Sequence, residues 1–168
     1  MIDFNQLLKK VESSKVYKHW KEENKNTFLC SFFNILSQDK DNGWQVYFYN
    51  EDKDSITSFL AEDNIELIEE GSKVFKEPGT KVDELKLKDV KIRLDEAFGI
   101  FEKLRMKKYP NESANKKVII LQKIKVPLWN ITYITSGFKT LNIKINAENG
   151  KIIEESLTSI LSSVKKID

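Results

Sequence analysis

Few residues of this chain belong to the types that perform covalent chemistry. Its one histidine is His19 and its one cysteine is Cys30. Catalysis by a nucleophile near neutral pH usually needs a Ser, Cys or Thr beside a histidine base. His19 lies next to Trp20 at the end of a predicted helix, where a surface position is expected. Cys30 stands among phenylalanines in a predicted strand, which favours an inert thiol. The sequence therefore predicts that the protein is not an enzyme.

Metal and nucleotide sites are also poorly supported. Residues 39–43 are rich in acids and resemble a calcium-binding loop, but Asn50 stands where the bidentate acid is required. Gly71 and Gly79 are isolated, and neither leads from a strand into a helix as a phosphate-binding loop does. We expect no metal and no cofactor. Because acidic residues are numerous, an enzyme with an unrecognised acidic site stays open as an alternative.

The composition predicts a folded, cytoplasmic chain. Its 168 residues are 40% hydrophobic, which is enough for a core, and a formal net charge of +2 gives no strong field toward nucleic acid or membrane. A single cysteine cannot form an intramolecular disulfide, which fits a reducing compartment. The first residues do not resemble a signal peptide, and no stretch approaches the roughly 18 apolar residues of a membrane span. We expect no membrane contact, and a cytoplasmic location unless a leader was removed.

The chain contains an internal repeat, because residues 44–70 align without a gap on residues 129–155. Trp44 falls on Trp129, and apolar residues recur at the same alternate positions in both segments. The other matched pairs are Val46 with Ile131, Phe48 with Tyr133, Ile56 with Leu141, Leu60 with Ile145, and Asn64 with Asn149. Since an inward side chain recurs at every second residue of a strand, both segments should present the same face to a core.

Each copy is predicted to begin with a helix. Apolar residues keep helical spacing from Phe4 to Trp20 in the first copy, and from Leu94 until Tyr109 and Pro110 end the helix in the second. Predicted strands follow at residues 27–37, 44–50, 55–61 and 65–68, and again at 118–126, 129–135, 138–147 and 151–153. A last amphipathic stretch predicts a C-terminal helix, whose apolar stripe is Leu157, Ile160, Leu161, Val164 and Ile167.

These elements predict an α+β fold of two tandem α-β-β-β(-β) units, each a helix packed on an antiparallel sheet, with a C-terminal helix. The expected boundaries are residues 1–70 for the first helix-plus-sheet unit, 71–91 for the connection, 92–155 for the second unit and 156–168 for the C-terminal helix. Gly, Pro and mixed charges mark the connection.

The second unit resembles a PepSY domain over residues 92–154. The resemblance rests on Leu94-Asp95-Glu96-Ala97 at the start of the helix, Tyr109-Pro110 after it, Trp129 in a strand and the Asn149-Gly150 turn. It implies a cystatin-like arrangement, one helix on a curled antiparallel sheet, here as a tandem repeat. It also implies a binding role, since members of the family are proposed to inhibit or regulate peptidases. Arg93 departs from the family, which usually has a small helix-capping residue at that position.

One predicted outer face is unusually aromatic. The alternation of the repeat turns Tyr47 and Tyr49 outward. In the next strand, Ile56 and Leu60 are expected to point inward, which turns Phe59 outward. A sheet face that meets water should be polar, so this one needs a cover. The C-terminal helix, the same face of a second molecule and an unknown partner are the candidates. Tyr47, Tyr49 and Phe59 are therefore the candidate interaction face.

The charges are unevenly distributed along the chain. Bases dominate the rim Lys103–Lys125, where Glu112 is the only acid, whereas acids dominate residues 51–77. A nucleic-acid binder that uses the basic rim is an alternative, but nucleic acid is not the expected partner because the stretch has few interleaved aromatic residues. Attraction between the two charged surfaces, within the molecule or between copies, is favoured instead. The leading hypothesis is a non-catalytic protein- or peptide-binding or assembly module, with a homodimer as one form.

Overall fold

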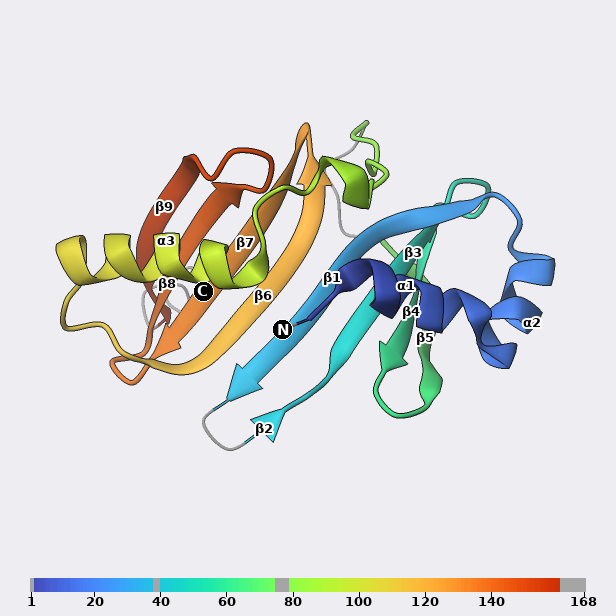
Figure 1. The fold of residues 1–168 in the computed structure, drawn as a ribbon, viewed down its shortest axis with the longest axis horizontal. Coiled ribbons are helices and arrows are strands. Elements are labelled where there is room, and N and C mark those ends of the chain that lie inside the picture. The colour runs from blue at the N-terminus through green and yellow to red at the C-terminus, as the bar shows by residue number, and fades with distance from the viewer. Residues whose placement is uncertain (1, 38–39, 75–78, 161–168) are drawn as a thin grey trace, which may run out of the picture.

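The computed structural model describes residues 2–37, 40–74 and 79–160, and in them three α-helices lie against one antiparallel sheet (Figure 1). The strand order is β5-β4-β3-β1-β6-β7-β8-β9, and the short β2 pairs with the end of β1. The predicted α+β class is confirmed. The helices are α1 (Phe4–Ser13), α2 (Lys15–Glu23), the 3-10 turn η1 (Leu87–Asp89) and α3 (Leu94–Lys108). The strands are β1 (Thr27–Ser37), β2 (Lys40–Asp41), β3 (Trp44–Asn50), β4 (Ser55–Ala61), β5 (Ile65–Lys73), β6 (Ala114–Ile124), β7 (Val126–Thr135), β8 (Lys139–Asn146) and β9 (Ile152–Ser159).

The pairing of β1 with β6 joins the two halves of the chain into one sheet. Residues 31–37 of β1 lie antiparallel to residues 116–122 of β6. On either side of this junction the strands follow one another as simple meanders, β1-β3-β4-β5 and β6-β7-β8-β9. The predicted separate sheets are therefore one continuous sheet. Without this pairing, β1 and β6 would be edge strands with unpaired backbone groups. At the junction these groups pair with one another.

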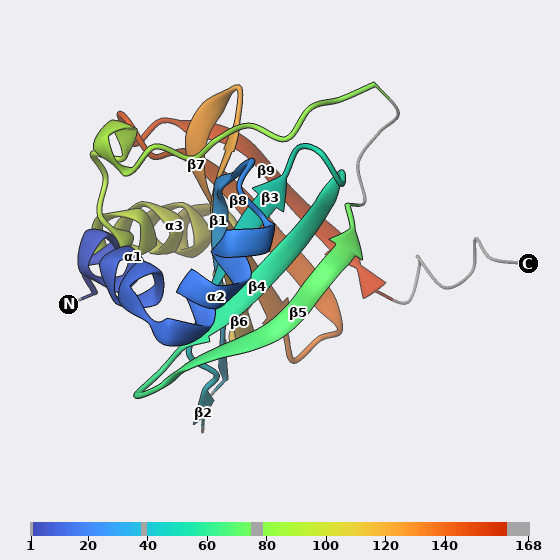
Figure 2. The same ribbon diagram turned by 90° about the vertical axis from the view of Figure 1, so that its right-hand side faces the viewer.

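The core lies on the side of the sheet that carries the helices (Figure 2). One row of directly paired residues crosses six strands there, and each member is fully buried. The row consists of Phe59, Val46, Phe32, Leu121, Trp129 and Ile145. Because the row passes through the β1–β6 junction without a polar residue, the two halves share one hydrophobic core.

The N-terminal helix α1 contacts both halves of the chain. Asp3 caps it, since one side-chain oxygen accepts hydrogen bonds from the backbone N–H groups of Asn5 and Gln6 at 2.9 and 3.2 Å. This start places the ring of Phe4 edge-on to Trp44 at 4.8 Å between centroids and 5.5 Å from the centroid of Trp129. One aromatic side chain thus contacts a core tryptophan from each half.

The predicted first helix is two helices, because Ser14 interrupts it. Ser14 has an extended backbone, with φ −68° and ψ 151°, and its side-chain oxygen accepts a hydrogen bond from the N–H of Tyr17 at 3.2 Å. A serine in this position competes with the helical backbone and starts a new helix instead. The resulting turn lets Tyr17 and Trp20 of α2 pack on Phe59, with ring centroids 5.5 and 5.3 Å apart.

The second-half helix α3 packs on β7. Arg93 is its N-cap residue, and the N–H of Arg93 donates to the Glu96 side chain at 2.8 Å, which is half of a capping box. Phe101 is fully buried and its ring lies 4.1 Å from that of Tyr133. Arg105, Lys107 and Lys108 occupy the last turn, where positive charge complements the helix dipole.

The predicted C-terminal helix is wrong for residues 156–159, which belong to β9. Leu157 pairs with Leu141 and Ser159 with Lys139, so the strand continues the ladder of β8 well beyond the short segment expected at 151–153. Backbone pairing along an existing strand outweighs the helical spacing at Leu157. Residues 161–168, which carry the rest of the predicted stripe, lie outside the described residues.

The connection between the halves is shorter than residues 71–91 and is partly buried. Strand β5 extends to Lys73, so the connection begins after that residue. Leu85 is only 2% exposed, and its N–H donates to the carbonyl of Leu29 at 2.9 Å. The segment before η1 is therefore tied to β1 and closes one end of the core.

The buried tryptophans should be essential to stability. Trp129 is fully buried and its indole N–H donates to the carbonyl of Ile92 at 2.9 Å. We expect Trp129→Ala to lower the free energy of unfolding by about 3–5 kcal/mol, the usual cost of deleting a large buried ring. Urea unfolding measures the change. Ile124→Ala, at a side chain that is 52% exposed, is the control and should change stability by less than about 0.5 kcal/mol. Equal effects would contradict the assignment of the core.

Candidate functional site on the helix-free face of the sheet

The candidate site is the side of the sheet that faces away from the helices. Trp44, Val46 and Phe48 point toward the helices, so the alternation along β3 turns Tyr47 and Tyr49 to the other side. These two positions agree with the predicted interaction face. Their burial differs, because Tyr49 is 7% exposed and Tyr47 is partly exposed.

Phe59, the third predicted site residue, lies on the opposite face and is fully buried. It pairs with Val46 and contacts the rings of Tyr17 and Trp20. The prediction for Phe59 is wrong because it assumed that the two copies align without a gap. Trp44 pairs with Ala61, which lies 17 residues later in the chain. Trp129 pairs with Ile145, which lies only 16 residues later.

The repeat therefore slips by one residue after the β3–β4 turn. A slip of one residue turns every following side chain of a strand to the other face. Ile56 and Leu60, which were predicted to point inward, consequently lie on the helix-free face, and Thr57 lies inward with Phe59. The extra residue lies in the β3–β4 turn, where no alternation of apolar and polar residues reveals it.

Partly buried apolar side chains gather at the centre of the helix-free face. They come from four adjacent strands, and we call them the open-face patch: Phe33, Ile35, Tyr47, Ile56, Leu60, Val118 and Ile120. Cross-strand pairing holds the group together, since Phe33 lies opposite Ile120 and Ile35 opposite Val118. All three α-helices are on the other side of the sheet (Figure 2).

Hydrogen bonds fix the two tyrosines of this face. The hydroxyl of Tyr47 donates to the side-chain oxygen of Gln45 at 2.8 Å, and its ring lies 6.2 Å from that of Phe33. The hydroxyl of Tyr49 donates to Asp54 at 2.6 Å. Burial, with a smaller effect of the charge on Glu69, raises the pKa of Tyr47. Tyr47 is therefore a neutral, pre-positioned aromatic side chain at neutral pH.

The two flanks of the open-face patch differ in charge. On the β5 side, Glu66 and Glu69 are exposed and pair with Leu60 and Ser58. On the β7–β8 side, the amide of Asn142 donates to Asn130 at 2.6 Å and to Thr132 at 2.7 Å. The face thus changes from acidic through apolar to mixed polar across the sheet.

One end of the open-face patch opens into a cavity of about 520 Å³. Ile56, Gln122 and Ile124 line it on the sheet side, and Val74 and Val82 line it from the connection. Cys30 also lines it, at a β-bulge between Leu29 and Ser31. Burial raises the pKa of its thiol to about 12, so the thiol is not activated.

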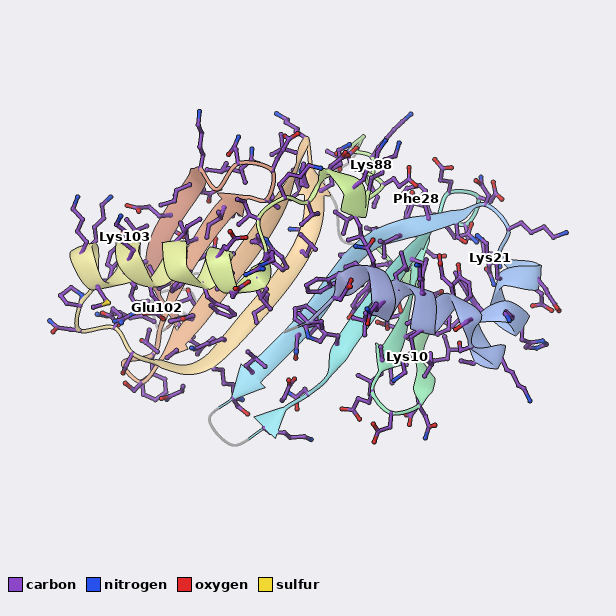
Figure 3. All side chains as sticks on the ribbon, in the orientation of Figure 1. Lys10, Lys21, Phe28, Lys88, Glu102 and Lys103 are labelled. Atoms are coloured by element: carbon purple, nitrogen blue, oxygen red, sulfur yellow. The ribbon has the colours of Figure 1, made fainter. Side chains whose placement is uncertain are left out.

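The basic rim Lys103–Lys125 does not form one surface. Lys103 is exposed on α3 (Figure 3), whereas Lys125 follows the end of β6, an 11-residue strand whose two ends lie about 30 Å apart. Two of its cations are engaged internally, because Arg105 pairs with Glu102 at 2.7 Å and Lys117 lies 4.9 Å from the ring centroid of Tyr133. The geometry does not favour a nucleic-acid groove along this rim.

A second cleft, of about 480 Å³, lies between the α1–α2 pair and residues 84–88. Lys21, Phe28 and Lys88 are among its lining residues (Figure 3). The Lys21 ammonium donates to the carbonyls of Lys25 and Thr27 at 3.0 and 3.1 Å, so it joins α2 to β1. Burial raises the pKa of Glu12, another lining residue. Acid–base catalysis by paired carboxylates needs two acids with different pKa values, and Glu12 is one acid.

Glu102 on α3 is a carboxylate with two hydrogen-bond donors. Its two oxygens accept hydrogen bonds from the hydroxyl of Tyr133 and from Arg105, the latter at 2.7 Å. Burial alone would raise the pKa of Glu102, but these two donors together outweigh burial and lower it. The arrangement anchors α3 to β7 and leaves the carboxylate ionised at neutral pH.

Replacing Glu102 should make stability less dependent on pH. Because the pKa of Glu102 is lower in the folded state, its contribution is present above the ordinary pKa of about 4.3 and is lost as the pH falls through the folded-state value. We expect Glu102→Gln to cost about 1 kcal/mol at pH 7, a figure reduced by solvent screening, and less near pH 3. Urea unfolding at both pH values tests this. Glu148→Gln, at an exposed turn, should show no such difference.

The assignment of β4 side chains to the two faces is also testable. Phe59→Ala should lower the free energy of unfolding by about 3–5 kcal/mol, because it removes a buried ring. Tyr47→Ala should cost about 1 kcal/mol, since Tyr47 is partly exposed. Thermal and urea unfolding of the two variants provide the comparison. A harmless Phe59→Ala would show that this side chain lies on the open face after all.

Comparisons with known proteins give no family. No protein-family model matches the chain, and no curated protein matches it. Among solved structures, the chain is similar to a crystal structure named "putative lipoprotein" from Clostridium difficile 630, with 14% sequence identity and a TM-score of 0.49. The similarity covers 88% of this chain and 93% of the other. Among the described helices, none has the length and apolar character that a membrane crossing requires.

Proposed function

We propose that the protein is a non-catalytic binding module that docks a protein or peptide segment on the open-face patch. The supporting observation is the contrast between the two halves of one sheet face. Residues of β8 on this face are Thr140, Asn142 and Lys144, as expected of a strand that meets water, whereas the residues of β1 are Phe33 and Ile35. Contiguous, partly exposed apolar side chains on a helix-free face support the proposal of an interaction surface there.

The proposed partner segment is extended and carries basic as well as apolar side chains. Apolar side chains would rest on Tyr47 and Phe33, which are rigid aromatic residues of the kind enriched at binding surfaces. Lysine or arginine side chains would approach Glu66 and Glu69 on the acidic flank, and an arginine would also find an aromatic ring beside it. The acidic flank repels nucleic acid from the same surface.

We also propose that the two halves are copies of one PepSY-like, cystatin-like unit. Each half has helical segments followed by a four-stranded meander, and Trp44 and Trp129 are buried on the helix side of the second long strand of each. A binding role is what this resemblance implies. The proposed location is the cytoplasm, where a single buried thiol is compatible with a reducing environment.

A pair of synthetic peptides tests the proposed site. An extended peptide of alternating lysine and leucine should bind, and a glutamate–leucine peptide should not, because of the acidic flank. The double variant Tyr47→Thr, Ile120→Thr keeps residues suited to strands and should weaken binding at least about ten-fold. Calorimetric titration measures both affinities.

The control is Thr140→Ser, on the same face but outside the open-face patch. Its affinity for the lysine–leucine peptide should equal that of the wild type. Binding that survives the double variant, or equal binding of both peptides, would falsify the proposal. Circular dichroism of each variant confirms that a lost affinity does not arise from unfolding.

A further inference from the structure

The starts of α1 and α3 leave a pocket between them on the helix side of the sheet. Both helices begin near the middle of the sheet, and they run in opposite directions from there (Figure 1). The pocket has a volume of about 310 Å³, and we call it the junction pocket. Its apolar walls are formed by Ile2, Phe4, Leu87, Val90, Ile92 and Leu94.

Both halves of the chain contribute to the junction pocket. Ile2 and Phe4 come from the first half, and the other wall residues precede or begin α3 in the second. All of these side chains are partly buried and pack against the hydrophobic core. Trp129 also lines the pocket, and the centroid of its ring lies 5.5 Å from that of Phe4. The pocket therefore offers apolar and aromatic surface to a ligand.

The charged residues that line the junction pocket are already engaged by groups of their own helices. One side-chain oxygen of Asp3 accepts hydrogen bonds from N–H groups in the first turn of α1. The guanidinium of Arg93 donates to both side-chain oxygens of Asp95, at 3.1 and 2.7 Å. An ionised ligand would lose its hydration here without gaining a free counter-charge, which is costly. The pocket therefore favours an uncharged ligand.

We propose that the junction pocket binds a small, uncharged, apolar molecule that contains an aromatic ring. The volume of the pocket lies at the lower end of the range typical of small-molecule sites, roughly 300–1,000 Å³. A ring in the pocket meets the rings of Phe4 and Trp129, and aromatic pairs gain energy beyond the area that they bury. The site lies on the opposite side of the sheet from the open-face patch, so it is separate from the proposed peptide site.

The ligand class is tested with a pair of probes that differ in charge. Naphthol is uncharged near neutral pH and carries two fused aromatic rings. It should bind the full chain and raise the melting temperature, because a ligand that binds only the folded state stabilises it. Naphthoate carries a carboxylate in place of the hydroxyl and should bind at least about ten-fold more weakly. Calorimetric titration measures both affinities. Equal affinities, or no binding of naphthol, would overturn the proposal.

The indole N–H of Trp129 reports where naphthol binds. It donates to the carbonyl of Ile92, a wall residue of the junction pocket, at 2.9 Å. In NMR spectra of the wild type, its resonance should shift as naphthol is added, whereas the indole resonance of Trp20 should stay in place. Trp20 packs against Phe48 and Phe59 and does not line the pocket. A Trp129 resonance that stays in place at saturating naphthol would show that the ligand binds elsewhere.

Filling the pocket tests the site by mutation. Val90→Trp places a large ring in the junction pocket and should weaken naphthol binding at least about ten-fold. Val82→Trp, in the cavity at the end of the open-face patch, is the matched control and should bind naphthol like the wild type. Wild-type affinity in Val90→Trp, or loss of binding in Val82→Trp alone, refutes the assignment of the site. Circular dichroism checks that both variants fold, and the wild-type titrations decide the question if Val90→Trp does not.

Discussion

The antiparallel pairing of β1 with β6 is the constraint on which the rest of the structure depends. It turns two meanders into one sheet, and it aligns Phe32 with Leu121 so that a single buried row runs from Phe59 to Ile145. Neither meander alone could bury that row from end to end. Phe4 strengthens the junction because its ring touches Trp44 and lies 5.5 Å from Trp129. The two halves are therefore expected to unfold as one cooperative unit.

The two faces of the sheet follow from where the helices can sit. Tyr17 and Trp20 occupy the helix side above Phe48 and Phe59, and Phe101 does the same above Tyr133. All the described α-helices pack on this side, so no described helix covers the side chains of the other face. The face nevertheless keeps apolar residues on β1, β3, β4 and β6. That mismatch between composition and cover is what makes the face a candidate binding surface.

The two halves of the molecule differ in how their acidic residues are engaged. Acidic residues stay exposed along β5, whereas several acids of the second half are engaged by cations or hydroxyl groups, as Glu102 is by Arg105 and Tyr133. The perturbed groups are held in structural contacts. The Lys21 ammonium, for example, donates to the carbonyl of Lys25, which precedes β1, and to that of Thr27, the first residue of β1. This pattern is compatible with the proposed binding role.

Sequence alone determined the α+β class, most strands and the inward positions of Trp44 and Trp129, because alternate apolar residues and tryptophans leave a local signal. It also placed Tyr47 on the helix-free face. Only the tertiary structure decided the position of Phe59, since one extra residue in the β3–β4 turn reverses the face of β4. The β1–β6 junction and the length of β9 were likewise beyond the sequence. Pairing between distant strands depends on which edges meet in space, and no local pattern records that choice.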